Sequence, residues 1–158
     1  MAVSAEQFRE GLRHWASGVT IVTSSCGERI HGMTVSAFSS VSLDPPLVLV
    51  CADKATITHG LIAESGVFAV NVLARGQEAL SNRFASKKDE HRRFEGIEWS
   101  RGATGAPILP GVLVALDCRV VAAHDAGDHV IYVGSVESIS ARQAEPLVYH
   151  VGAYRALV

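Results

Sequence analysis

Alternation of hydrophobic and polar residues recurs along the chain and predicts strands more often than helices. Residues 19–24 are almost all β-branched, a turn follows at 26–28, and residues 29–38 alternate, which together predict a hairpin. In its second arm one face carries Met33, Val35 and Ala37, and the other carries Thr34, Ser36 and Phe38. Small hydroxyl side chains leave room for a flat polar ligand against the backbone, so the second face is either a site wall or a solvated sheet face.

Further apolar runs predict the remaining strands at 47–51, 67–73, 112–124 and 129–139, with short ones at 147–150 and 152–155. The run 47–51 is apolar throughout, which predicts burial on both of its faces. The turn at 125–128 makes the two long segments antiparallel partners. About six strands joined mostly by hairpins, without a strand-helix-strand rhythm, predict a mainly β chain folded as a closed antiparallel barrel.

Short helices complete the predicted fold. A capping box at 4–7 precedes a predicted helix at 5–16. A second helix is predicted to start near Thr56 or Thr58, where its free amides would also favour an anion. A third helix is predicted at 77–85.

Composition limits the classes of partner. The 158 residues are 48% hydrophobic and 19% charged, which suits one globular domain spanning 1–158. A formal charge of -2 gives no basic surface for nucleic acid or an anionic membrane. The start lacks a basic segment followed by an apolar one, so we expect a cytoplasmic protein. Three cysteines at wide spacings predict neither a disulfide framework nor a metal site.

Familiar catalytic motifs are absent from the sequence, including the nucleophile elbow, the phosphate-binding loop, the dinucleotide fingerprint and the zinc helix. Asp53 and Lys54 suit a ribityl chain and a phosphate, or an exposed ion pair. Arg83 suits an anion, or the outer face of a helix. His129 could pack against a heterocycle or simply be solvated. The mixed charges at 87–93 are interpreted as a solvated segment unless a phosphate needs them.

One ordered set of segments covers nearly the whole chain: 8–9, 18–23, 32–48, 68–73, 80–85, 94–96, 99, 127–131 and 152–154. It includes Gly-Met-Thr-Val-Ser-Ala-Phe at 32–38, Asn-Arg-Phe-Ala at 82–85 and Gly-Asp-His at 127–129. The set resembles the short-chain flavin reductases of two-component monooxygenase systems, the flavin reductase-like family with an FMN-binding split barrel. No single piece is diagnostic, but the ordered set is highly specific.

The resemblance implies a six-stranded antiparallel Greek-key split barrel with a few short helices, forming a homodimer with flavin at the subunit interface. It implies that Met33, Thr34, Val35 and Ser36 border the isoalloxazine, and that Cys51, Ala52, Asp53, Lys54 and Thr58 follow the ribityl chain and phosphate. It also implies that Ser81, Arg83 and Phe84 close over the phosphate end, that His129 lies by the nicotinamide as the catalytic residue, and that Tyr154 lies near the same pocket. The carboxylate of Asp53 would repel phosphate unless Lys54 or Arg83 compensated it.

The activity implied by the resemblance is reduction of FMN or FAD by NADH or NADPH, with hydride passing from nicotinamide C4 to flavin N5. The reduced flavin would then pass to a separate monooxygenase. Because the cofactors carry this chemistry, a chain without a protein nucleophile fits it. Two alternatives stay open: a non-catalytic flavin- or haem-binding carrier or sensor, and a flavin-mediated reductase of another acceptor such as a corrinoid or a ferric chelate.

Overall fold

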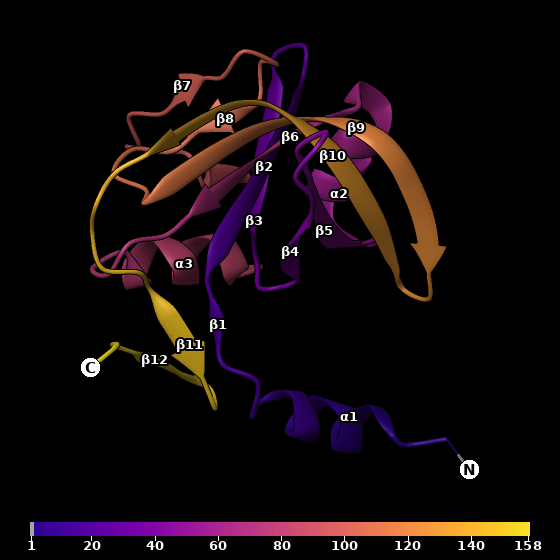
Figure 1. Ribbon diagram of the computed structural model, residues 1–158, viewed down its shortest axis with the longest axis vertical. Helices are drawn as coiled ribbons and strands as arrows, with labels where there is room; N and C mark the ends of the chain where they lie inside the picture. Colours follow the sequence, from indigo (N-terminus) through magenta and orange to yellow (C-terminus); the bar gives the residue numbers. More distant parts are fainter. Residues whose placement is uncertain (1) are drawn as a thin grey trace.

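The alternating segments build one strongly curved antiparallel sheet in the computed structural model, which describes residues 2–158 (Figure 1). In spatial order its seven strands are β3 (Arg29–Val35), β2 (Thr20–Cys26), β6 (Val67–Val72), β9 (Val114–Ala126), β10 (His129–Ala141), β5 (Leu47–Asp53) and β4 (Phe38–Ser42). The mainly β prediction is confirmed, with seven strands in this sheet where six were expected. Within the described residues the edge strands β3 and β4 are not paired with each other, so the barrel is split rather than closed.

Both predicted hairpins are present. β2 pairs with β3 from Thr20 opposite Val35 to Cys26 opposite Arg29. β9 and β10 pair over most of their length, with a register shift between Val133 and Gly134. A Cβ at Gly134 would lie 2.5 Å from Cζ of Phe68, so only glycine lets this strand approach the buried ring.

The core lies inside the curved sheet, around the fully buried side chains of Val22, Val50, Phe68 and Val70. The prediction that 47–51 is buried on both faces is wrong, because buried and partly exposed residues alternate along β5. Only the inner face of this antiparallel strand packs in the core, which is the usual arrangement when no helix covers the other face.

Two helices pack on the sheet as predicted. α2 (Ile57–Ser65) starts at the Thr56 N-cap, whose hydroxyl accepts from the amide of His59 at 3.2 Å, and ends at Gly66, which has a φ of 72°. α3 (Glu78–Ala85) buries Phe84 completely. The 3₁₀ helix η1 (Glu90–Arg92) follows it. Among residues 2–158, no helix is both long and apolar enough to cross a membrane.

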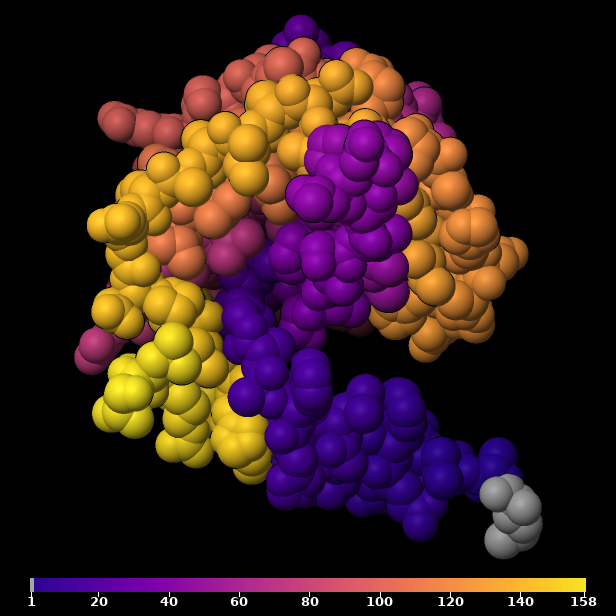
Figure 2. All heavy atoms as spheres, in the orientation of Figure 1, coloured from indigo at the N-terminus to yellow at the C-terminus, as the bar shows by residue number. Residues whose placement is uncertain are grey.

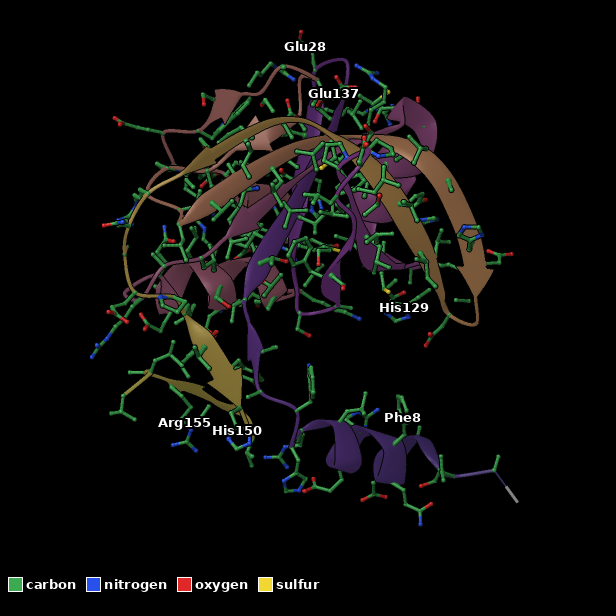
Figure 3. All side chains as sticks on the ribbon, viewed as in Figure 1. Phe8, Glu28, His129, Glu137, His150 and Arg155 are labelled. Carbon is green, nitrogen blue, oxygen red and sulfur yellow. The ribbon has the colours of Figure 1, made fainter. Side chains whose placement is uncertain are left out.

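The N-terminal helix stands apart from the rest of the molecule (Figure 2). α1 (Ala5–Leu12) begins at the predicted capping box but ends four residues before the predicted position 16. None of its residues is buried, and Phe8 extends from it with 57% of its surface exposed (Figure 3). After the helix, the carbonyl of Arg13 accepts from the amide of Val151 at 3.0 Å. The chain therefore leaves the helical path to join the C-terminal segment.

Two small sheets complete the fold. A three-stranded sheet joins the segment after α1 to the C-terminal segment. Its strands are β1 (Ser17–Gly18), β11 (Val148–His150) and β12 (Ala153–Arg155). β7 (Ser100–Arg101) pairs with β8 (Pro107–Ile108) within the segment that was predicted to be mostly loop.

A buried carboxylate anchors this loop to the main sheet. Asp117 on β9 is 1% exposed and accepts from the amide of Thr104 at 2.8 Å and from its hydroxyl. Gly102 lies against the same carboxylate, where a Cβ would be 2.6 Å from Oδ2. The Asp117 carboxylate on β9 thus holds loop 102–106 against the main sheet.

Candidate functional site

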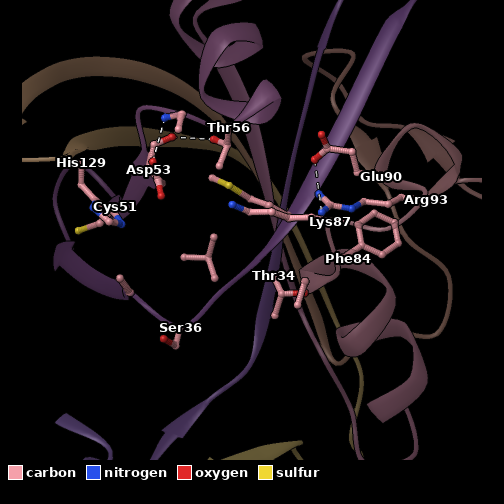
Figure 4. Close-up of a pocket in the computed structure, with 15 residues that line it drawn as sticks. Thr34, Ser36, Cys51, Asp53, Thr56, Phe84, Lys87, Glu90, Arg93 and His129 are labelled. Carbon is pink, nitrogen blue, oxygen red and sulfur yellow. Dashed lines mark hydrogen bonds and ion pairs between the residues drawn. The ribbon is translucent and has the colours of Figure 1, made fainter. Parts of the chain in front are cut away.

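A pocket of about 450 Å³ lies between the C-terminal ends of β3 and β5 (Figure 4). β3 and the two residues after it form one wall with residues 33–37. β5 and the following loop supply the opposite side, α3 supplies part of the floor, and β10 contributes its first residue. This volume falls within the range of about 300–1,000 Å³ that is typical of small-molecule sites.

Many of the residues that the resemblance singled out meet in this pocket. They are Met33, Thr34, Val35, Ser36, Cys51, Asp53, Phe84 and His129. Segments far apart in the sequence are therefore brought to one cavity by the barrel, with β3 and β5 as its two sides. Burial raises the pKa of the Cys51 thiol, so this side chain is a neutral lining group at neutral pH.

A second pocket of about 330 Å³ adjoins the first and shares Thr34, Ser36 and Ala85 with it. Ser81 and Tyr154 line this second pocket. The Tyr154 hydroxyl donates to Ser81 Oγ at 2.8 Å, and the Thr34 hydroxyl donates to the Ser81 carbonyl at 2.6 Å. Tyr154 thus lies on the far side of the Thr34–Ser36 segment from His129, which lines only the first pocket.

Four residues that the resemblance assigned to the flavin lie outside both pockets. Ala52 is fully buried in the core. Thr58 is also fully buried, and its hydroxyl is 2.8 Å from Nδ1 of His31. Neither side chain has a free surface to offer a ligand, because β5 directs Ala52 inward and α2 packs Thr58 against the sheet.

The two cations expected to compensate Asp53 also point elsewhere. Lys54 Nζ lies 3.1 Å from Asp125 Oδ1 on the neighbouring hairpin. Arg83 Nη2 donates to the carbonyls of Arg92 at 3.0 Å and Glu95 at 2.7 Å. Lys54 and Arg83 therefore have partners outside the pocket, and their assignment to the flavin stays a prediction.

The loop after α3 supplies pocket residues that the sequence did not single out. Lys87, Glu90 and Arg93 line the pocket, and Arg93 is only 5% exposed. The interpretation of 87–93 as a wholly solvated segment is therefore wrong at its end. One signal was available, since Phe94 directly follows Arg93 and packs edge-on against Phe84 with ring centroids 5.2 Å apart. An aromatic residue at that position indicates that the chain returns to the core.

Two carboxylates flank the histidine at the pocket mouth. His129 lies opposite Asp53 in the pairing of β10 with β5. Its Nδ1 lies 2.7 Å from Asp128 Oδ1, and this hydrogen bond lowers the pKa of Asp128. Asp53 Oδ1 instead accepts from the amide of Ala55 at 2.8 Å. A carboxylate can only accept, so the proton of the neutral ring sits on Nδ1 and leaves Nε2 as an acceptor.

The pocket suits a flat, polar ligand that carries an anionic group. Its β3 wall presents small side chains and backbone where the strand ends at Val35. Arg93 brings a buried positive charge to the cavity, and its Nε has no hydrogen-bond partner among the described residues. A buried donor without a partner is costly, which favours a bound acceptor near it.

Comparisons with known proteins agree with this geometry. Residues 12–158 match the family model described as a flavin reductase like domain. The chain is 44% identical over 158 residues to an NADH-dependent flavin reductase of a Rhodococcus species, covering 98% of this chain and 88% of that protein. It is 38% identical over 157 residues to the reductase subunit HsaB of a flavin-dependent monooxygenase of Rhodococcus jostii, covering 99% and 80%.

A solved structure shows the same fold. BorF, the flavin reductase component of a bacterial two-component tryptophan halogenase, superposes with a TM-score of 0.90 at 39% identity, covering 98% of each chain. The family model spans most of the sequence, and the relatives cover nearly all of it. This chain therefore belongs to the flavin reductase like family.

Proposed function

We propose that this protein is an NAD(P)H-dependent flavin reductase that supplies reduced FMN or FAD to a separate oxygenase. The observation that carries the proposal is the pocket between β3 and β5, which combines a thin backbone wall, the Phe84 ring and a buried cation. Relatives named as flavin reductases and as reductase components of two-component systems support it.

The chain contributes position and orientation. When bound together, a reduced nicotinamide and a flavin supply hydride transfer between their rings. Residues 33–36 would hold the flavin ring by backbone groups and hydroxyls at the end of β3, and the fully buried Phe84 would support this segment by packing against the backbone of Gly32. Tyr154, in the adjoining pocket, would contact the part of the nucleotides that extends past Ser36. Holding two reactants in a fixed geometry is the main contribution that such a site can make to the rate.

His129 would position the nicotinamide. Asp128 holds its Nδ1, so Nε2 remains to accept a hydrogen bond, for example from the NH₂ group of a carboxamide. The ring is half-buried at the pocket mouth and needs no other role in the reaction.

Replacing His129 with alanine should raise the KM for the nicotinamide by about fivefold, the value of one lost hydrogen bond, and change the KM for flavin by less than about twofold. Steady-state kinetics with each substrate varied in turn measures the two KM values separately. The His124→Ala variant is the matched control, because His124 is exposed on the same hairpin. An unchanged nicotinamide KM in the His129 variant contradicts this role.

The proposal includes a homodimer in which the second copy of the chain packs on α1. Phe8 and Leu12 are each 57% exposed on a helix of eight residues that buries none of its side chains, and Trp15, just after the helix, is 78% exposed. So short a helix is marginal alone in water, and clustered exposed apolar side chains usually mark an interface. The resemblance implies a homodimer, and the second copy of the chain would cover this surface.

Light scattering should give twice the 16.8 kDa mass of the chain. The double variant Phe8→Ala, Leu12→Ala should raise the dimer dissociation constant by at least about tenfold, because each loses a large apolar side chain from the interface. Arg9→Ala, on the polar face of the same helix, should leave the dimer intact. A monomeric native protein, or a double variant as dimeric as the native one, contradicts this arrangement.

The function itself is tested by mixing the protein with NADH or NADPH and with FMN or FAD under anaerobic conditions. Loss of the oxidised flavin absorbance, dependent on the protein, is the expected result.

A further inference from the structure

His31 is a histidine buried near the pocket wall. It lies on β3, two residues before Met33, and is only 5% exposed. Its Nδ1 lies 2.8 Å from the Thr58 hydroxyl of α2, and its Nε2 has no hydrogen-bond partner among residues 2–158. A buried N–H without a partner is tolerated less well than a buried acceptor. The proton of the neutral ring therefore sits on Nδ1 and is donated to Thr58.

The loop after α3, residues 86–93, is tied to β3 beside this ring. Arg93 donates from Nη1 to the carbonyl of Gly32, the residue after His31, at 2.7 Å. It also donates from Nη2 to the Ser86 carbonyl at 2.7 Å, so one guanidinium joins both ends of the loop to the strand. Three side chains of this loop line the pocket (Figure 4). The position of loop 86–93 therefore decides the shape of that side of the cavity.

The surroundings of His31 oppose a positive charge on its ring. Burial and then the charge of Arg93 lower the pKa of His31. Thr58 lies in the first turn of α2, the positive end of the helix dipole. Glu90 acts in the opposite direction through its carboxylate and its backbone, but its side chain is 40% exposed and screened by water. On β2 the residue opposite His31 is Ser24, which does not titrate.

A proton on the ring would therefore carry two costs while the loop is closed. Nε2 would become a donor without an acceptor in the core, and a second cation would lie beside Arg93. Movement of loop 86–93 away from β3 relieves both costs. Water would then reach Nε2, and the guanidinium of Arg93 would leave the neighbourhood of the ring.

We propose that His31 is a pH-sensitive switch whose protonation in mildly acidic solution releases loop 86–93 from β3 and opens that side of the pocket. The closed loop requires the neutral ring, and the open loop admits the charged one. Above about pH 6.5 neither form takes up a proton on this ring. Below it only the open form does, so each unit of pH favours opening by up to about tenfold. The switch is a property of the chain alone and holds whichever ligand the pocket binds.

Amide hydrogen exchange without ligand tests the switch, with rates expressed as protection factors at about pH 7.5 and about pH 5.5. The amide of Arg92, which donates to the Asp89 carbonyl at 2.8 Å, reports on the loop. Its protection should stay below that of the β2 amides at both pH values and should fall by about tenfold at the lower one. His31→Gln cannot titrate and should lose this fall. His91→Gln is the matched control that should keep it, because His91 is exposed in the same loop.

Three results would overturn the switch: unchanged protection of the Arg92 amide, the same fall in His31→Gln as in the native protein, or an Arg92 amide as protected as β2. The last would mean that only unfolding of the whole domain frees the loop. None of them bears on flavin reduction, since no flavin is present. Should His31→Gln fail to fold, NMR titration of the native histidine rings replaces it. The His31 ring must then take up its proton together with shifts of the loop amides, and a ring that titrates while the loop stays unchanged overturns the proposal.

Discussion

Replacing Phe84 with alanine should lower the free energy of unfolding by about 3–5 kcal/mol. The ring is fully buried and packs edge-on against Phe94 with centroids 5.2 Å apart. It also lies directly on the backbone of Gly32, where a Cβ would be 3.0 Å from the ring. Neither neighbour can fill the cavity left by the ring, because the strand backbone is fixed by its ladder and Phe94 has its own contacts.

Urea unfolding of the native and variant proteins measures this loss. The Ile139→Ala variant serves as a control, since Ile139 is 65% exposed on β10 and should change the stability by less than about 0.5 kcal/mol. Phe84 also lines the pocket, so flavin affinity should fall in the same variant. A loss of stability below about 1 kcal/mol would show that α3 is not held by this side chain.

Replacing Asp117 with alanine should cost about 2–4 kcal/mol of unfolding free energy, although it removes a polar side chain. The carboxylate is 1% exposed and accepts both the amide and the hydroxyl of Thr104. Its loss leaves these two partly buried donors without their acceptor. Loop 102–106 should therefore loosen before the rest of the sheet does.

Hydrogen exchange distinguishes this local effect from a general loss of stability. Relative to the native protein, the exchange rate of the Thr104 amide should rise more in Asp117→Ala than the exchange rates of the β2 amides. Thr104→Val keeps the amide but removes the hydroxyl, and it should cost about 1 kcal/mol. Glu98→Ala, at an exposed position just before the loop, should have almost no effect. Uniform changes across the sheet and the loop would contradict the anchoring role of Asp117.

The strands and their pairing could be predicted because the signals for them are local. Alternation in 29–35, the β-branched run before it and the turn at 125–128 each identify a hairpin without knowledge of the rest of the chain. The outer face of β5 could not be predicted, because Leu47 and Leu49 are as apolar as their buried neighbours. Their exposure depends on what the fold places over that face. The early end of α1 has a similar cause, since Val151 captures the Arg13 carbonyl from 138 residues away.

The site was predictable only in part, for a related reason. Residues 33–36, Cys51, Asp53 and His129 lie at strand ends, and the order of the strands brings them together. Residue type does not reveal the direction of a side chain. Arg83 and Arg93 are ten positions apart, yet Arg83 donates to a loop carbonyl outside the pocket and Arg93 donates to the Gly32 carbonyl of β3. Burial of Arg93 follows from the packing of Phe94 beside it, which is a tertiary contact.

Anaerobic reduction of flavin is the most direct test of the central claim. With native protein, an excess of NADH or NADPH and either FMN or FAD, the absorbance of oxidised flavin should disappear at a rate proportional to protein concentration. The same mixture without protein should change far more slowly, and the His129→Ala variant should need more nicotinamide to reach the native rate. If no combination of nicotinamide and flavin reacts faster with the folded protein than without it, the protein is not a flavin reductase.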